Sequence, residues 1–383
     1  MKKSLWAMAA LGAFAVEAHA QNSATLYGII DAGVVYTSNV NGSKQYQLAS
    51  SNQQGTRWGM RIIENLGGGL SALAVIENSF NVVNGKMTAG NLFGGQSFVG
   101  LSSSRMGTVM LGRQYTSVTD YTSLLAVSTQ WATYYGDHPG DLDNMNNTNR
   151  INNAIKYASP NFGGLTFGGA FSLGGVAGDF NRNQIWSFGT AYSNGPLSAG
   201  IAFLHIEDPN FSFFGNNAAS STTASNMSIS TVYSGYASAR TQEIFSSGIA
   251  YAIGRATLGM TYSNTSFKDL GVEPSLNPNH YSGSAYFHNV EASFKFQITP
   301  SLLAGAAYNY TKGYGVNDAR YGQASLGVDY FLSKRTDIYL VGNYQHASGT
   351  DSTGQRARAN IAGLSASSSA NQVSAVAGIR HKF

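Results

Sequence analysis

Residues 289 to 298 read Asn-Val-Glu-Ala-Ser-Phe-Lys-Phe-Gln-Ile, and the alternation within this stretch decides the fold. Every second residue is apolar: Val290, Ala292, Phe294, Phe296 and Ile298. The residues between them are polar or charged. A period of two is typical of a β-strand that has one face in an apolar medium and the other face in water.

The same alternation recurs along the chain, in the stretches Ala24–Tyr36, Arg57–Ile62, Gln323–Leu332 and Val373–Phe383. Short turns rich in Gly, Pro, Asn and Ser are expected at Asn65–Gly69, Ser102–Gly107, Ser159–Gly164, Ser193–Pro196, Ile253–Arg255, Thr299–Ser301 and Ser333–Thr336. Longer polar loops are expected at Ser38–Gln54, Asn81–Gly95, Thr116–Asn149, Gly174–Asn183, Glu207–Arg240, Ser263–Ser284, Lys312–Arg320 and Ala347–Ala370. These connections predict sixteen antiparallel strands, with short periplasmic turns at one rim and long extracellular loops at the other, as in a transmembrane β-barrel.

A soluble β-sandwich or a small-ligand barrel is the alternative fold. Sixteen strands with an inward apolar face would enclose far more volume than side chains can fill. An open sheet would expose strand edges that lipid does not tolerate. Charged residues make up only 11% of the chain, whereas an ordinary soluble domain has about 25%. The mean hydropathy of −0.13 is compatible with a membrane barrel, because lipid-facing and lumen-facing residues average out along each strand.

The first twenty residues have the composition of a secretory signal peptide. Lys2 and Lys3 form a positive start, and Leu5–Val16 is almost wholly apolar. Ala18-His19-Ala20 offers a small-residue cleavage motif, so we expect cleavage after Ala20 and a barrel over residues 21–383. Cleavage would lower the formal net charge from +4 to +3, because two lysines and one glutamate are lost. The chain is thus expected to be exported to the outer membrane.

The final stretch gives an independent signal. Its alternation continues to Phe383, so the last predicted strand is amphipathic and ends on an aromatic residue. We expect Phe383 to act as the signal that the outer-membrane assembly machinery binds.

A set of motifs distributed along the chain points to one family. The motifs are Thr25–Gly33, Thr56–Arg61, Glu64–Leu70, Phe98–Leu101, Gly107–Gln114, Asn152–Tyr157, Leu332–Thr336 and Gly378–Phe383. Together they resemble the Gram-negative general porins of the β-proteobacterial and neisserial type. The resemblance covers essentially all of residues 21–383. It implies a sixteen-stranded homotrimer whose third loop folds into the pore, and passive diffusion of ions and small hydrophilic solutes.

The chain departs from the family pattern at two positions. The relatives usually carry an arginine where Gly95 stands, and they often carry an aspartate in place of Asn65. The change at Gly95 removes a charge from the wall, so we expect a weaker anion preference or a wider passage.

A diffusion pore needs a constriction with a charge pattern and no catalytic residue. Because side chains alternate between the two faces of a strand, the positions of the apolar residues predict which residues face the lumen. This strand parity directs four basic side chains into the lumen: Arg57, Arg61, Arg150 and Lys156. Parity also directs Glu77 inward. The segment Thr116–Asn149 matches the inward-folded third loop and contributes four acids: Asp120, Asp137, Asp141 and Asp143. The predicted constriction therefore sets a basic wall against an acidic loop, with a weak preference for anions.

Two points of this assignment stay open. Asp141 and Asp143 suit loop anchoring as well as pore lining, because aspartate also favours turns and caps. Arg113 shares parity with the outward-facing Val109 and Leu111, so it is expected at a rim, at a trimer contact or at a β-bulge.

Other classes of function are less well supported. An outer-membrane enzyme would need an acid–base pair beside a nucleophile, and the candidates, Asp137 with His138 and His205 with Glu207 and Asp208, lie in no nucleophile motif. A substrate-specific channel or an adhesin are the remaining alternatives. The sequence indicates no metal site, no cofactor and no nucleic-acid partner. The expected partners are outer-membrane lipid, lipopolysaccharide, the assembly machinery and two further copies of the chain.

Overall fold

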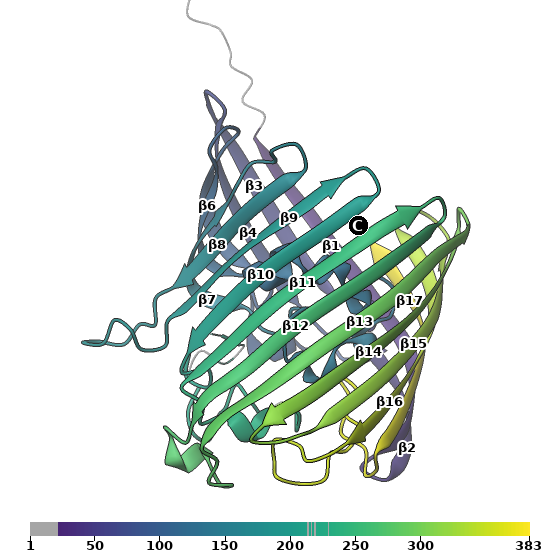
Figure 1. The fold of residues 1–383 in the computed structure, drawn as a ribbon. Helices are drawn as coiled ribbons and strands as arrows, with labels where there is room; N and C mark the ends of the chain where they lie inside the picture. The colour runs from purple at the N-terminus through teal and green to yellow at the C-terminus, as the bar shows by residue number, and fades with distance from the viewer. Residues whose placement is uncertain (1–21, 213, 216, 218–219, 229) are drawn as a thin grey trace, which may run out of the picture.

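The computed structural model describes residues 22–383, apart from 213, 216, 218–219 and 229. The predicted signal peptide, with its cleavage site after Ala20, lies outside the described residues. Within them the strands wind into one tilted cylinder (Figure 1). The strands are β1 (Ser23–Val40), β2 (Ser43–Ser50), β3 (Arg57–Gly67), β4 (Leu70–Ser79), β5 (Ser97–Ser103), β6 (Gly107–Gln114), β7 (Ile151–Ala158), β8 (Leu165–Ser172), β9 (Ile185–Asn194), β10 (Leu197–Glu207), β11 (Thr241–Ile253), β12 (Ala256–Leu270), β13 (Gly283–Thr299), β14 (Leu302–Gly315), β15 (Arg320–Phe331), β16 (Thr336–Ser348) and β17 (Asn371–Lys382).

The sheet closes because β1 has partners on both of its edges. One edge pairs with β17, from Ile29 opposite Lys382 to Thr37 opposite Ser374. The other edge pairs with β3 along its first half and with β2 along its second half. β2 and β3 therefore share one position around the cylinder. The described residues form a closed sixteen-stranded antiparallel barrel, which confirms the predicted fold class.

Asp31 holds the break between β2 and β3. Its carboxylate accepts hydrogen bonds from the backbone N–H groups of Asn52, Gln53 and Gln54, at 3.2, 2.8 and 2.8 Å. The Tyr339 hydroxyl donates to the same carboxylate at 2.6 Å. The irregular backbone between the two strands is thus satisfied inside the barrel, as a buried chain segment requires.

The sequence-based boundaries of three loops are wrong. Ser38–Gln54 is mostly strand, because β1 and β2 form a hairpin around Asn41 and Gly42. Strands also extend into Ser263–Ser284 and Lys312–Arg320, where β12 continues to Leu270 and β14 continues to Gly315. The end of β12 carries polar residues on both faces, and the end of β14 contains two glycines, so the apolar alternation that reveals a strand is missing there. All seven predicted short turns lie between consecutive strands, as expected.

The outer surface of the barrel carries a band of exposed apolar side chains. Large examples on neighbouring strands are Ile249, Leu258, Phe294, Tyr308 and Leu326. Exposed apolar residues on this scale suit a surface that faces lipid. Among the described residues, no helix has the length and apolar character needed to cross a bilayer.

The helices of the described residues are short and lie in the connections. They are η1 (Thr88–Gly90), α1 (Ser117–Tyr121), η2 (Ser123–Leu125), η3 (Val127–Thr129), η4 (Tyr134–Gly136), η5 (Pro139–Asp141), η6 (Ser234–Tyr236) and η7 (Pro274–Leu276). Five of them, from α1 to η5, follow one another between β6 and β7. We call this connection, residues 115–150, the inner loop. It lies inside the cylinder, behind the front strands in Figure 1.

Candidate functional site: the inner loop and the charged wall

The inner loop is fixed to the inside of the barrel by hydrogen bonds and by close packing. At its start, Ser117 bonds Ser187 of β9 at 2.9 Å, between the two hydroxyl oxygens. Further along, Thr122 bonds Ser246 of β11 at 2.8 Å in the same way. Trp131 then lies directly over Gly305, where an added Cβ would come within 2.3 Å of the indole. The barrel wall is therefore shaped to receive the loop.

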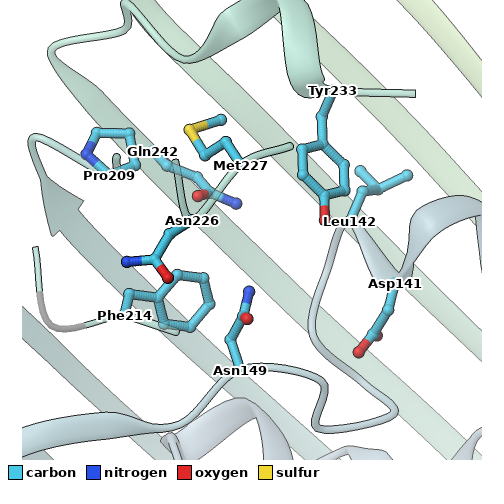
Figure 2. A pocket seen from close by; sticks show the side chains of 9 residues that line it. All are labelled: Asp141, Leu142, Asn149, Pro209, Phe214, Asn226, Met227, Tyr233 and Gln242. Atoms are coloured by element: carbon cyan, nitrogen blue, oxygen red, sulfur yellow. The ribbon is translucent and has the colours of Figure 1, made fainter. Parts of the chain in front are cut away.

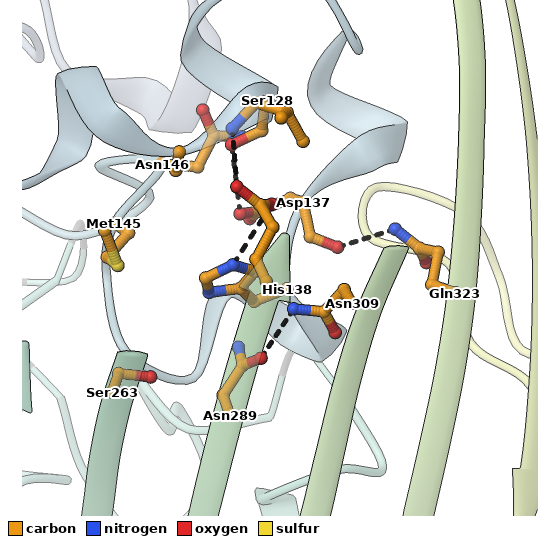
Figure 3. Close-up of polar contacts among 12 residues, drawn as sticks. Ser128, Asp137, His138, Met145, Asn146, Ser263, Asn289, Asn309 and Gln323 are labelled. Carbon is orange, nitrogen blue, oxygen red and sulfur yellow. Dashed lines mark hydrogen bonds and ion pairs between the residues drawn. The ribbon is translucent and has the colours of Figure 1, made fainter. Parts of the chain in front are cut away.

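His138 lies at the centre of a buried attachment between the inner loop and the wall (Figure 3). Its Nδ1 atom is 2.6 Å from Asp143 Oδ2, and its Nε2 atom is 3.4 Å from Glu291 Oε2 on β13. The Ser263 hydroxyl on β12 also donates to Asp143, and Glu291 accepts the backbone N–H of Val127 at 3.0 Å. These groups are almost fully buried, so loop and wall share an enclosed ion cluster.

The charges in this cluster set each other's protonation. Burial by itself would lower the pKa of His138, but Asp143 and Glu291 outweigh burial and raise that pKa well above its usual value. Burial likewise favours protonated Asp143, but His138 outweighs it and lowers the Asp143 pKa. The pair is thus an imidazolium facing a carboxylate at neutral pH.

Asp137 and Asp141 occupy buried positions in the same part of the loop. Asp137 Oδ1 accepts a hydrogen bond from the Ser128 hydroxyl at 3.3 Å. Burial is the main cause that raises the pKa of Asp137 well above its usual range, and the charge of Asp141 is the next. The Asp141 carboxylate accepts the backbone N–H groups of Asn146 and Thr148 at 2.9 and 2.8 Å. Burial, followed by Asp143, raises the pKa of Asp141 to about 6.

The basic wall opposite contains a second charge cluster, around Glu77 of β4. Arg57 Nε lies 3.1 Å from Glu77 Oε2. The hydroxyls of Tyr27 and Tyr115 donate to the two oxygens of this carboxylate, at 3.2 and 3.1 Å. A Cβ added at Gly95 would lie 2.3 Å from Glu77 Oε1. The glycine therefore leaves the room that the carboxylate occupies.

Tyr115 connects this cluster to the remaining charges. Its ring lies under the Arg150 guanidinium, 5.7 Å from the ring centroid. Its carbonyl oxygen accepts a hydrogen bond from the Lys156 ammonium at 3.2 Å. Lys156 also forms an ion pair with Asp120 of α1. Within the described residues, neither Arg150 nor Arg61 forms an ion pair, and the Arg61 side chain is exposed.

The structure thus gathers five of the predicted site residues around Tyr115: Arg57, Glu77, Asp120, Arg150 and Lys156. Arg61 lies on the same face of β3, four residues further along. Asp137, Asp141 and Asp143 are buried between the inner loop and the far wall. The sequence reasoning did not single out Tyr115 or Glu291. Glu291 could have been found from the sequence, because it follows the lipid-facing Val290 in an alternating strand and must therefore face the lumen.

Arg113 lies at a β-bulge, one of the three expected positions. The pairing of β6 with β7 shifts register between Gly112 and Gln114, and Gly112 has a φ of 139°. β7 advances by three residues where β6 advances by two, and Arg113 is buried beside the irregularity. Its guanidinium donates to the carbonyl oxygen of Gly94 at 3.1 Å and to Asn152 Oδ1 at 2.6 Å.

Other candidate sites offer less chemistry. Figure 2 shows a small cavity between the inner loop and the connection that follows β10, lined by Asp141, Leu142, Asn149, Pro209, Phe214, Asn226, Met227, Tyr233 and Gln242. His205 lies on the outer face of β10, where its ring stacks on Trp186 and its nitrogens contact Glu207 and Glu243. Within the described residues, no three His, Asp or Glu side chains form a cluster suited to a metal ion.

Comparisons with known proteins agree on one family. The family described as Gram-negative porin matches residues 7–350. An outer membrane porin protein of Bordetella pertussis is 29% identical over 377 residues, covering 90% of this chain and 94% of the relative. Outer membrane porin protein 32 of Delftia acidovorans is 31% identical and matches both chains over their full length. Among solved structures, an anion-selective porin from Comamonas acidovorans superposes with a TM-score of 0.73 at 21% identity, covering 95% of this chain and all of that one. The trimer form of OmpT from Vibrio cholerae superposes with a TM-score of 0.65 at 15% identity, covering 94% and 99%.

Proposed function

Because the chain belongs to the Gram-negative porin family, with its barrel in the outer membrane, we propose that ions and small hydrophilic solutes diffuse through it with a weak preference for anions. The passage runs along the basic wall of β3, β4, β6 and β7, beside the inner loop. The family and the relatives are channels, so the protein has no need of a catalytic group.

One observation carries the proposed anion preference. The acids beside the passage each face a cation: Glu77 faces Arg57, and Asp120 faces Lys156. Arg61 and Arg150 are left without an acidic partner among the described residues. Excess positive charge along the passage attracts anions and repels cations.

The three remaining acids of the inner loop serve a different purpose in this proposal. Asp137, Asp141 and Asp143 are buried and hydrogen-bonded, and Asp143 faces His138. They hold the loop in position and add little negative field to the passage. Arg61 and Arg150 consequently control ion selectivity, and the loop acids control the width of the constriction.

The proposed assembly is a homotrimer in contact with outer-membrane lipid and lipopolysaccharide. The trimeric OmpT structure shares the fold, which supports this assembly state. Phe383 pairs with Gly28, each backbone N–H donating to the other carbonyl oxygen at 3.0 Å. This placement at the seam supports its role as the signal for the assembly machinery. Residues 1–20 are proposed as the signal peptide, removed after Ala20.

The decisive experiment is electrical recording from the purified, refolded protein in a planar bilayer. Single-channel steps establish the pore, and the reversal potential across a potassium chloride gradient establishes its selectivity. We expect discrete, long-lived steps in groups of three and a reversal potential of the anion-selective sign. Arg61→Glu and Arg150→Glu should each move that potential toward cations. Lys334→Glu, on an exposed turn away from the passage, is the control and should leave it unchanged.

Two outcomes would overturn different parts of the proposal. A correctly folded barrel that gives no conductance would exclude the diffusion pore. Stable steps of the cation-selective sign would keep the pore but refute the assignment of selectivity to Arg61 and Arg150.

A further inference from the structure

A row of basic residues lies on the outer surface, at the end of the barrel that carries the long loops. The lipid-facing side chains of β13 and β14 are apolar or aromatic up to Val290 and Tyr310. The next outward positions on these strands hold His288 and Lys312, and β15 begins with Arg320. All three side chains are exposed. The row therefore begins where the apolar band ends.

The strand register places these three residues side by side. His288 is directly opposite Lys312, and Lys312 is directly opposite Arg320. Directly opposite residues have Cβ atoms about 5 Å apart, and like charges at this distance destabilise a sheet. Three adjacent strands span about 10 Å, so the row is as wide as a small headgroup.

No carboxylate in the described part of the chain forms an ion pair with Lys312 or Arg320 of this row. The acid nearest in sequence to Arg320, Asp318, accepts the backbone N–H of Thr350 at 2.8 Å. The outer ends of β10 to β12 are different, because there Lys268 forms an ion pair with Glu243. The row on β13, β14 and β15 therefore differs from the balanced pair on β11 and β12.

We propose that His288, Lys312 and Arg320 bind a phosphate group of lipopolysaccharide in the outer leaflet. This inference rests on the outer-membrane location and extends the proposed function by giving the lipid contact a place on the barrel. A phosphate carries negative charge at the depth where the apolar band ends, and it relieves the repulsion between Lys312 and Arg320. Arginine and lysine are the side chains that recognise phosphate oxygens most often.

Neighbouring aromatic rings fix the histidine of this site. Tyr314 stacks on His288 with ring centroids 5.0 Å apart and an interplanar angle of 11°. Tyr286 stacks on the other side of the same tyrosine, also at 5.0 Å. The Tyr262 hydroxyl and His288 Nδ1 are hydrogen-bonded at 2.9 Å. The His288 side chain remains exposed, and its hydrogen bonds among the described residues use Nδ1.

The test uses the full barrel, refolded in lipid-free detergent and titrated with diphosphoryl lipid A. The double variant Lys312→Glu/Arg320→Glu should bind this lipid at least about tenfold more weakly than the parent, since two attractive charges become repulsive. Lys334→Glu/Arg335→Glu makes the same charge change on the exposed turn between β15 and β16, and its affinity should stay at the parent level. Lipid A without phosphates should bind parent and double variant equally.

A stability measurement separates lipid binding from a structural role. Lys312→Glu places opposite charges across from each other, so in lipid-free detergent it should raise the melting temperature while it weakens lipid A binding. Unchanged lipid A affinity in the double variant, with folding intact, would overturn the proposal. Inorganic phosphate that competes with lipid A at equal concentration would overturn it too, because the site would then serve a free ion. Normal conductance in the double variant keeps this test independent of the pore.

Discussion

The Nδ1 atom of His138 lies 2.6 Å from Oδ2 of Asp143, within a contact that is almost wholly closed to water. The histidine also reaches Glu291 on the barrel wall. One side chain thus connects two turns of the inner loop to β13. Loss of that side chain leaves two buried carboxylates without their cation.

We therefore predict that His138→Ala detaches the inner loop. Breaking a buried ion pair from one side costs about 3–5 kcal/mol, because the remaining charge stays desolvated. Limited proteolysis should then cut within residues 115–150, and current traces should show frequent brief closures. His205→Ala, on the outer face, is the matched control and should resemble the parent. A loop that stays resistant to protease in His138→Ala would contradict the anchoring role.

Loop attachment should also depend on pH in a defined direction. The pKa of Asp141 is raised from 3.8 to about 6, so its contribution to stability is present below 3.8 and is lost as the pH rises through 6. Asp137, with its pKa also raised, acts in the same direction. Asp143 has a lowered pKa, so its contribution is lost only as the pH falls below 3.8. The contribution of His138 is lost at a pH well above 6.5.

The melting temperature of the refolded barrel should accordingly fall between about pH 4 and pH 7. Asp141→Asn removes one of the two titrating groups, and its melting temperature should change less over that range. Asp179→Asn, in the loop between β8 and β9, serves as the control. An identical slope in the parent and in Asp141→Asn would refute the assignment.

Gly95 offers a steric test of the charged wall. Gly95→Ala puts a methyl group where the Glu77 carboxylate lies, at 2.3 Å, and should cost about 1–3 kcal/mol in the free energy of unfolding. The neighbouring Gly94→Ala would meet its closest atom at 3.4 Å, an ordinary contact, and should cost little. Urea titration in detergent measures both. Equal losses in the two variants would show that the carboxylate moves away freely.

Removal of a paired acid should strengthen the anion preference. Glu77→Gln leaves Arg57 without its counter-charge, so the reversal potential should move further in the anion-selective direction. Asp120→Asn should act in the same way through Lys156. Glu207→Gln lies on the outer face and should have no effect. A shift toward cations in Glu77→Gln would place Arg57 outside the passage.

The strand period and the composition of the connections together were enough to predict the barrel, its sixteen positions and its seven short turns. The strand period also brought Arg57, Glu77 and Lys156 to the same wall, because side-chain direction in a regular strand follows from position. The hairpin of β1 and β2 was missed, since its return strand offers few apolar residues and is ended by contacts to Asp31, which lies about twenty residues earlier in β1. Such contacts between distant segments leave no local pattern.

The directions of the side chains in the inner loop could not be predicted from the sequence in this way. Its chain has no regular period, so nothing in the sequence distinguishes an aspartate that faces water from one that faces the wall. Asp120 and Asp143 look alike in sequence, but Asp120 meets Lys156 beside the passage and Asp143 meets His138 behind the loop. Arg113 shows the same limit within a strand, because its burial depends on a register shift between β6 and β7 and on contacts to Gly94 and Asn152, which leave no local pattern.

The pairing of β1 with β17 makes membrane insertion a concerted event. These strands come from opposite ends of the chain, and until they meet the sheet has two open edges whose N–H and C=O groups lack partners. Hydrocarbon cannot hydrate those edges, so a half-built sheet has no resting state within the bilayer. Closure of so distant a pair is entropically slow, and its reversal must reopen the whole seam at once. Once formed, the channel should therefore persist kinetically, with a lifetime set by the seam and independent of the strength of any single contact.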